Sequence, residues 1–120
     1  MHKIIDVPYI DQSVAYPTGC ESVSATMLLQ YLGYEITVDE FIRDYVPCVP
    51  MQERDGQLYG PDPRKVFCGS PYDEDSFGCY APVICEALQK AVGDRYTVVD
   101  ETGTSMQELI EHYIDRDMPV

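Results

Sequence analysis

Residues 17–33 carry the clearest hydrophobic periodicity in the chain. On a helix with 3.6 residues per turn, positions spaced i, i+3, i+4 and i+7 share one face, which we predict to be buried. These positions are Cys20, Val23, Ser24, Met27, Leu28, Tyr31 and Leu32. Residues 17–19 break the chain before this helix, and Gly33 is of the type that commonly ends one. The pattern therefore places Cys20 in the first turn of a helix.

The position of Cys20 allows two interpretations. At a helix N-terminus, unpaired backbone N–H groups and the positive end of the helix dipole stabilise an anion, so this thiol should ionise more easily than a mid-helix or core thiol. Free cysteines are otherwise often small buried hydrophobic residues. The helical stretch by itself leaves both interpretations open.

Two further helices open with capping signals. Thr37 and Glu40 have the spacing of a capping box, which predicts a helix over residues 38–45 that a following proline terminates. Ser105 and Glu108 repeat this signal ahead of another helical face. That face consists of Met106, Leu109, Ile110 and Tyr113.

One more helix and three short extended segments complete the predicted elements. Pro82 suits the first turn of a helix, and Gly93 suits its end. The β-branched and aromatic content of residues 3–10 and 96–99 predicts short extended segments, and residues 117–120 resemble a turn that leads into a strand. The order of elements is that of a helix-rich half with little sheet.

Residues 47–78 lack periodicity and are rich in proline and glycine, with three consecutive acidic residues at positions 73–75. An irregular segment of this length within one domain is often functional, so we expect it to line a substrate cleft. The alternative is a packed surface loop that buried aromatic residues hold in place. The candidates for that role are Tyr59, Phe67, Tyr72 and Phe77.

Length and charge limit the class of protein. The 120 residues suffice for one domain, which we assign to residues 1–120. The formal net charge of −13 argues against nucleic acid or an anionic membrane surface as a partner, because either would repel the chain. No apolar run has the length of a membrane span, and the first residues lack the apolar region of a signal peptide. We expect a soluble chain, and its location stays open.

The five cysteines are an odd number, so at least one of them stays unpaired within a monomer. Cys20 is our choice for the unpaired thiol. The other four can form two disulfides or remain thiols, and the sequence leaves this open. They are Cys48, Cys68, Cys79 and Cys85. Because no C-x-x-C pair occurs, we expect neither a zinc ribbon nor a thioredoxin-type motif. A metal site built from Cys68, Cys79, Cys85 and a distant histidine is the alternative, which the spacing does not support. We expect no metal and no cofactor.

Several runs of residues, in the order in which they occur, resemble the C39-like group of papain-like cysteine peptidases. They are IDVPYIDQ, YPTGCESVSATMLLQYLGY, DP followed by FCGSP, GCYAPVICEAL, VDETGTS followed by ELI, and MPV. The resemblance implies an α+β, papain-like fold that hydrolyses peptide or related amide bonds. It also implies that Cys20 is the nucleophile and that Gln12, which by position alone is a solvated loop residue, helps to form the oxyanion hole.

The resemblance further implies residues that these 120 do not supply. In the family, the general-base histidine and the Asp or Asn that orients it lie in the sheet-forming half, which would follow Val120. We interpret His2 and His112 as surface residues. The chain is thus predicted to be the helical N-terminal lobe of a peptidase, with the C-terminal β lobe apparently missing.

Two expectations and one alternative follow from this interpretation. A cysteine without its base loses most of its activated thiolate, so the 120 residues alone should be nearly inactive. The face that would pack on the absent lobe should favour self-association. The alternative is a non-catalytic C39-like module that binds peptides, for which the acidic surface would favour a basic ligand.

Overall fold

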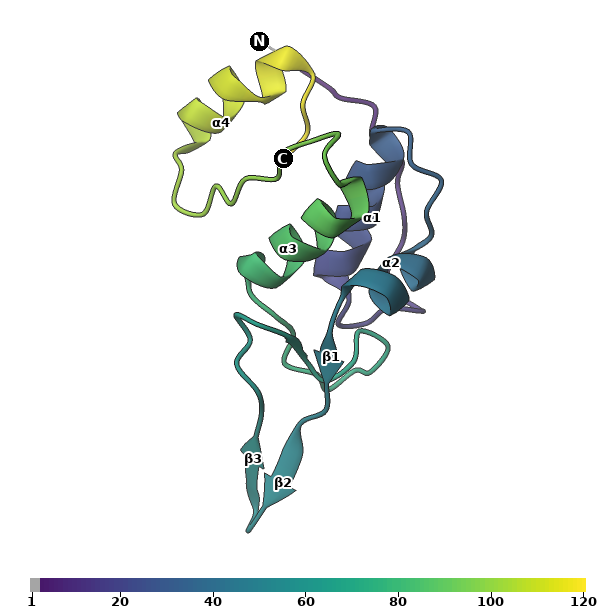
Figure 1. The fold of residues 1–120 in the computed structure, drawn as a ribbon, viewed down its shortest axis with the longest axis vertical. Helices are drawn as coiled ribbons and strands as arrows, with labels where there is room; N and C mark the ends of the chain where they lie inside the picture. The colour runs from purple at the N-terminus through teal and green to yellow at the C-terminus, as the bar shows by residue number, and fades with distance from the viewer. Residues whose placement is uncertain (1–2) are drawn as a thin grey trace.

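Three helices meet at the centre of the molecule, as the computed structural model shows for residues 3–120 (Figure 1). Helices α1 (Cys20–Tyr31), α2 (Val38–Tyr45) and α3 (Ala81–Val92) pack against one another. Helix α4 (Met106–His112) and the 3₁₀ helix η1 (Ile114–Arg116) pack on each other at one end of the elongated molecule.

Four short strands lie in the segment that connects α2 with α3. Strands β1 (Cys48–Val49) and β4 (Phe67–Cys68) pair in parallel, with Cys48 opposite Phe67. Strands β2 (Gln52–Arg54) and β3 (Gln57–Tyr59) form an antiparallel hairpin that projects away from the helices (Figure 1). The fold is therefore a mixture of helices and few strands.

The buried face of α1 differs from the predicted one. Val23 is buried as expected, but Cys20 and Ser24 are exposed. The buried positions are Ser22, Val23, Ala25, Thr26 and Leu29. Because α1 packs against both α2 and α3, small and weakly polar residues allow the close approach that the apolar pattern could not indicate. The Thr26 hydroxyl is satisfied inside the helix, where it donates to the Ser22 carbonyl at 2.8 Å.

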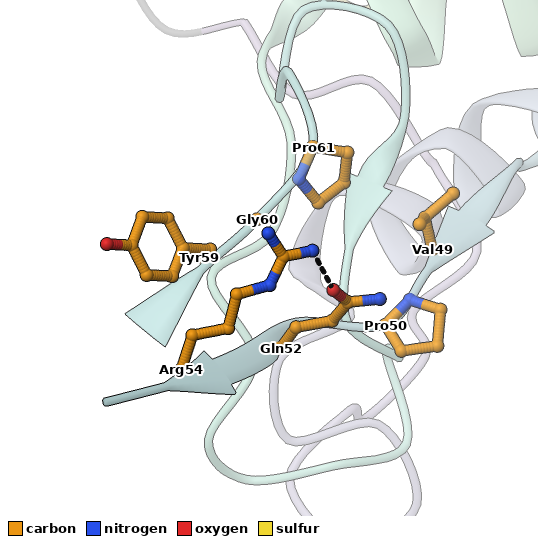
Figure 2. A pocket seen from close by; sticks show the side chains of 7 residues that line it. All are labelled: Val49, Pro50, Gln52, Arg54, Tyr59, Gly60 and Pro61. Atoms are coloured by element: carbon orange, nitrogen blue, oxygen red, sulfur yellow. Dashed lines mark hydrogen bonds between the residues drawn. The ribbon is translucent and has the colours of Figure 1, made fainter. Parts of the chain in front are cut away.

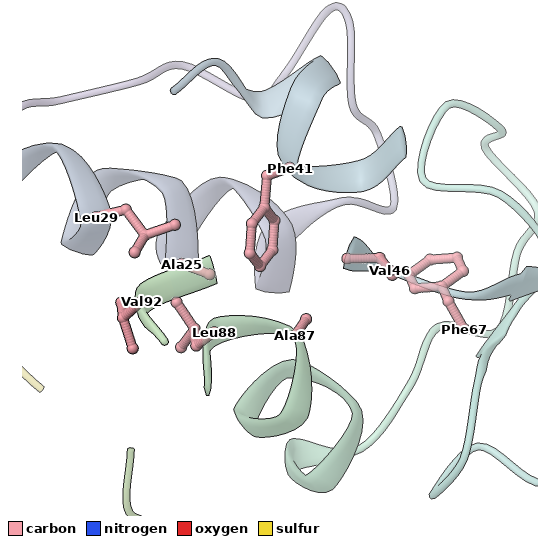
Figure 3. Close-up of a cluster of buried hydrophobic side chains, with 8 residues drawn as sticks. All are labelled: Ala25, Leu29, Phe41, Val46, Phe67, Ala87, Leu88 and Val92. Atoms are coloured by element: carbon pink, nitrogen blue, oxygen red, sulfur yellow. The ribbon is translucent and has the colours of Figure 1, made fainter. Parts of the chain in front are cut away.

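The core joins α1 to both of its neighbours (Figure 3). One cluster contains Leu29 of α1, Phe41 of α2, Ala87 of α3 and, at the junction with the strands, Phe67. A second cluster packs Val23 against α2. These contacts fix the direction of α1 and with it the position of the Cys20 end.

The capping box at Ser105 is confirmed, whereas at Thr37 only the bond from the Glu40 amide forms and the return bond from the Glu40 side chain does not. The Thr37 hydroxyl accepts from the Glu40 amide at 3.2 Å, and α2 has the predicted bounds. Ser105 and Glu108 form a reciprocal capping box at the start of α4. Gly93 ends α3 with a φ of +59°, a conformation that favours glycine. The apolar face of α4, in contrast, is not fully buried, and Met106 is 72% exposed.

The predicted extended segments do not form strands. Residues 3–10, 96–99 and 118–120 are irregular, because a strand needs a partner for its backbone groups. The side chain of Gln89 on α3 supplies that pairing for one of these segments. It accepts from the Val98 amide at 2.9 Å and donates to the Tyr96 carbonyl at 2.9 Å.

The segment of residues 47–78 is less irregular than predicted. Asp55 and Gly56, with φ of 51° and 77°, form the tight turn of the β2–β3 hairpin. Of the four aromatic residues that the alternative of a packed surface loop would bury there, only Phe67 is fully buried. The exposed ones are Tyr59, Tyr72 and Phe77. Within residues 3–120, no helix is long and apolar enough to cross a membrane.

Candidate functional site

Cys20 is the first residue of α1, and its side chain is exposed. No side chain caps this end of the helix, because the N-cap residue is Gly19. The amides of the first helical turn have no partners within the helix and remain available to an anion. The structure therefore places the thiol at an open helix N-terminus and not in packed hydrocarbon.

The neighbouring carboxylate works against ionisation of this thiol. The Cys20 Sγ donates to Glu21 Oε2 at 3.3 Å. Partial burial, followed by the hydrogen bond and the charge of Glu21, raises the pKa of the Cys20 thiol, whereas the backbone amides of Cys20 and Glu21 act to lower it. The expected stabilisation by the helix end is present, but the opposing effects outweigh it.

Replacing this carboxylate provides a test of its effect. In a Glu21→Gln variant the charge and the acceptor of the thiol proton are lost, so the pKa of Cys20 falls. At a pH below the pKa of Cys20, lowering this pKa by one unit gives about ten times more thiolate. Each thiolate is then about threefold less nucleophilic, so alkylation becomes about threefold faster. The measurement is the pH profile of iodoacetamide reaction at Cys20. A Glu35→Gln variant, at an exposed glutamate beyond the other end of α1, should leave the profile unchanged.

Gln12 lies in the loop before α1 and is half-buried. Its Nε2 donates to the Tyr16 carbonyl oxygen at 3.3 Å, and the Gly19 amide donates to the same oxygen at 3.0 Å. The Tyr16 amide in turn donates to the Gln12 carbonyl at 2.9 Å. The Gln12 amide is therefore held next to the residue that precedes Cys20.

A loop from the connecting segment braces the approach to Cys20. The Thr18 hydroxyl lies 3.0 Å from the Ser70 carbonyl and 2.7 Å from the Asp73 carbonyl. Gly19 and Pro71 are both buried where the two loops touch. Nearby, residues 69, 70 and 72–76, together with Pro50 and Met51, line an open groove of about 640 Å³.

A second pocket lies at the base of the β2–β3 hairpin (Figure 2). It has a volume of about 330 Å³, and Arg54 crosses it to donate to Gln52 Oε1 at 2.8 Å. None of the residues that line it is a cysteine, histidine or carboxylate. We therefore assign the candidate chemistry to the Cys20 end of α1.

The other cysteines differ from Cys20 in their surroundings. Cys48 is exposed on β1, Cys68 is buried on β4, and Cys79 and Cys85 are half-buried. All are free thiols. Burial is the main cause that raises the pKa of Cys79 to about 12. No group of acidic, cysteine or histidine side chains within residues 3–120 is arranged to hold a metal ion.

His112 is exposed at the end of α4, as predicted. This end of the molecule is attached to the far end of α1, where the Tyr31 hydroxyl donates to the Asp117 carbonyl at 2.6 Å. Since α1 runs from Cys20 to Tyr31, about 16 Å of helix separates that attachment from the thiol. His2 lies outside the residues that the structure describes.

Sequence reasoning missed the residues that surround the predicted pair. Tyr16 and Glu21 are direct contacts of Gln12 and Cys20, respectively, and Asp39 and Tyr72 hold Tyr16 from other elements. The adjacency of Glu21 to Cys20 in the sequence was a signal for the first of these contacts. The hydrogen bonds from Tyr16 and from Tyr72 to Asp39 span 23 and 33 residues, respectively, which no local pattern indicates.

The chain belongs to the peptidase C39-like family, whose model matches residues 4–120. It is 31% identical over 102 residues to the uncharacterised protein YvpB of Bacillus subtilis (strain 168), a match that covers 85% of this chain and 38% of YvpB. A solved structure from Bacillus anthracis that is described as a C39-like peptidase superposes with a TM-score of 0.70 and 27% identity. That match covers 91% of this chain and 52% of the solved chain.

These comparisons confirm the family that the sequence motifs indicated and the mixed fold. The chain spans about half, or less, of the length of these relatives. The additional β lobe and the roles of Cys20 and Gln12 stay predictions.

Proposed function

We propose that this chain is part of a cysteine peptidase-like hydrolase that cleaves peptide or related amide bonds through the Cys20 thiolate. The observation that carries the proposal is an exposed thiol at the uncapped N-terminus of α1, with the Gln12 amide bonded to the Tyr16 carbonyl that also accepts from the amide of Gly19, the residue before Cys20. Membership of the peptidase C39-like family supports this class of reaction.

The proposed reaction proceeds through an acyl-enzyme. The Cys20 sulfur attacks the substrate carbonyl carbon and forms a thioester as the bond to the leaving group breaks. The Gln12 amide and the Cys20 backbone N–H donate to the oxyanion that develops on the carbonyl oxygen. Water then hydrolyses the thioester. The groove beside Ser70 and Asp73 is our candidate for the surface that the peptide contacts.

We propose that none of the described residues acts as the general base of this reaction. His112 is the one histidine among residues 3–120. It ends α4, which is attached near the opposite end of α1 from Cys20. We therefore expect the 120 residues alone to acylate at Cys20 without appreciable peptide turnover. Peptide hydrolysis by these residues that is lost in a Cys20→Ala variant would show that this expectation about the base is wrong.

An activated ester tests nucleophilic attack by Cys20 separately from general-base catalysis. A peptide p-nitrophenyl ester releases a good leaving group that needs no proton from a general acid. Because the proposed oxyanion donors lie at Cys20, the ester should acylate Cys20 faster than Cys48, the other exposed thiol. Mass spectrometry of the modified peptides measures both rates. A Gln12→Ala variant should acylate at least tenfold more slowly, because an oxyanion donor is lost. Alkylation by iodoacetamide, which forms no oxyanion, should be unchanged.

The controls decide between the enzyme and the peptide-binding module. A Gln57→Ala variant removes an exposed glutamine from β3 and should alter neither the acylation nor the alkylation of Cys20. Equal and slow modification of Cys20 and Cys48 would contradict the proposed nucleophile and favour the non-catalytic module. The acidic residues that line the groove, Asp73, Glu74 and Asp75, are the observation that favours a basic peptide for such a module.

A further inference from the structure

One carboxylate on α2 holds tyrosines from two separate loops. Asp39 Oδ1 accepts from the Tyr16 hydroxyl at 2.9 Å and from the Tyr72 hydroxyl at 2.7 Å. The rings of the two tyrosines also contact each other, with centroids 5.6 Å apart. The three residues therefore connect the loop before α1, the first turn of α2 and the loop that borders the groove.

The charge state of this cluster suits its hydrogen bonds. The bonds from Tyr72 and Tyr16 lower the pKa of Asp39, and its place in the first turn of a helix also favours the anion. Burial and the bond to Asp39 raise the pKa of Tyr72 to about 12. At neutral pH the carboxylate is therefore ionised while both hydroxyls keep their protons, which is the state that allows both bonds.

Tyr16 transmits this constraint to the candidate site. Its backbone carbonyl accepts from the Gln12 side chain and from the Gly19 amide, and its own amide donates to the Gln12 carbonyl. At the tip of the loop Val14 is 92% exposed and the Ser13 amide bonds locally to Asp11, while the Tyr16 ring packs against the second hydrophobic cluster. The bond from the Tyr16 hydroxyl is thus a long-range tie between this loop and the helices.

We propose that Asp39 is a positioning residue that, through Tyr16, holds the Gln12 amide beside the N-terminus of α1. Tyr72 braces the same carboxylate from the groove side. The catalytic meaning of this arrangement rests on the proposed function, but the arrangement itself can be tested without any reaction. A Tyr16→Phe variant removes one hydroxyl and leaves the charges of α2 unchanged.

Hydrogen exchange provides the test that needs no catalysis. The test uses the ¹⁵N-labelled chain of 120 residues. Loss of the hydrogen bond from Tyr16 to Asp39 should speed exchange of the Gly19 amide roughly three- to tenfold in the Tyr16→Phe and Asp39→Ala variants. The side-chain NH₂ signals of Gln12 should shift in both. Asp39→Asn, whose amide oxygen can still accept from both hydroxyls, should retain most of the protection. Asp44→Ala removes a carboxylate of the same helix that binds Arg43 and should change neither signal.

The two chemical probes provide a readout that a merely structural role would not change. Tyr16→Phe should slow acylation of Cys20 by the activated ester, by no more than Gln12→Ala does, and should leave iodoacetamide alkylation unchanged. Unaltered Gly19 exchange and Gln12 signals in Tyr16→Phe, with the Glu40 amide still protected by its cap, would overturn the proposal. If Gln12→Ala has no effect on acylation, the proposed oxyanion role fails while the exchange result still decides whether Asp39 positions the loop.

Discussion

A Phe67→Ala variant should lose about 3–5 kcal/mol of the free energy of unfolding, the range found when a fully buried phenylalanine is truncated. Phe67 is 0% exposed on β4, and its ring lies in the cluster that joins Val46 to the three central helices (Figure 3). Its amide also donates to the Pro47 carbonyl at 2.7 Å, which fixes the residue to the segment after α2. A large cavity therefore opens where the strand pair meets the helices.

The measurement is chemical denaturation followed by circular dichroism. Since domains of this size are typically stable by about 5–15 kcal/mol, the loss should be a large part of the total stability. Phe77→Ala is the matched control, because Phe77 lies in the same segment but is 59% exposed. Its cost should be about 1 kcal/mol or less. Similar losses for the two variants would show that Phe67 does not connect the strands to the core.

A Gly19→Ala variant should be destabilised by about 1–3 kcal/mol and should also displace the thiol. A Cβ at this position would lie 2.9 Å from Tyr16 Cβ and 3.2 Å from Pro71 Cβ, and both of those atoms are attached directly to backbone. Neither neighbour can rotate away, so the loop before α1 must move. The reason is close packing, since the φ of Gly19 is −101° and suits any residue.

This variant is measured in two ways. Denaturation gives the loss of stability, and the rate of iodoacetamide reaction at Cys20 reports the change at the helix N-terminus. Ser24→Ala, on the exposed side of the same helix, should leave both within experimental error. Wild-type stability and thiol reactivity in Gly19→Ala would mean that the loop before α1 is not in tight contact with the loop that contains Pro71.

Some features of the fold could be predicted from the sequence because they depend only on residues that are close together in the chain. The capping box of Ser105 and Glu108, the Thr37 cap and the glycine that ends α3 all form within a few residues of sequence. The turn at Asp55 and Gly56 belongs to the same class, and its Asp-Gly pair was a hairpin signal that the absence of periodicity in residues 47–78 obscured.

The candidate site was predictable only in part. The sequence determined that Cys20 begins a helix, and its motifs pointed to the peptidase C39-like family, because local propensity and residue order are properties of the chain itself. Only the tertiary structure decided which face of α1 is buried, which strands find partners and which carboxylate holds Tyr16. Those outcomes depend on contacts between residues far apart in sequence, whose free energy is gained only after the helices pack.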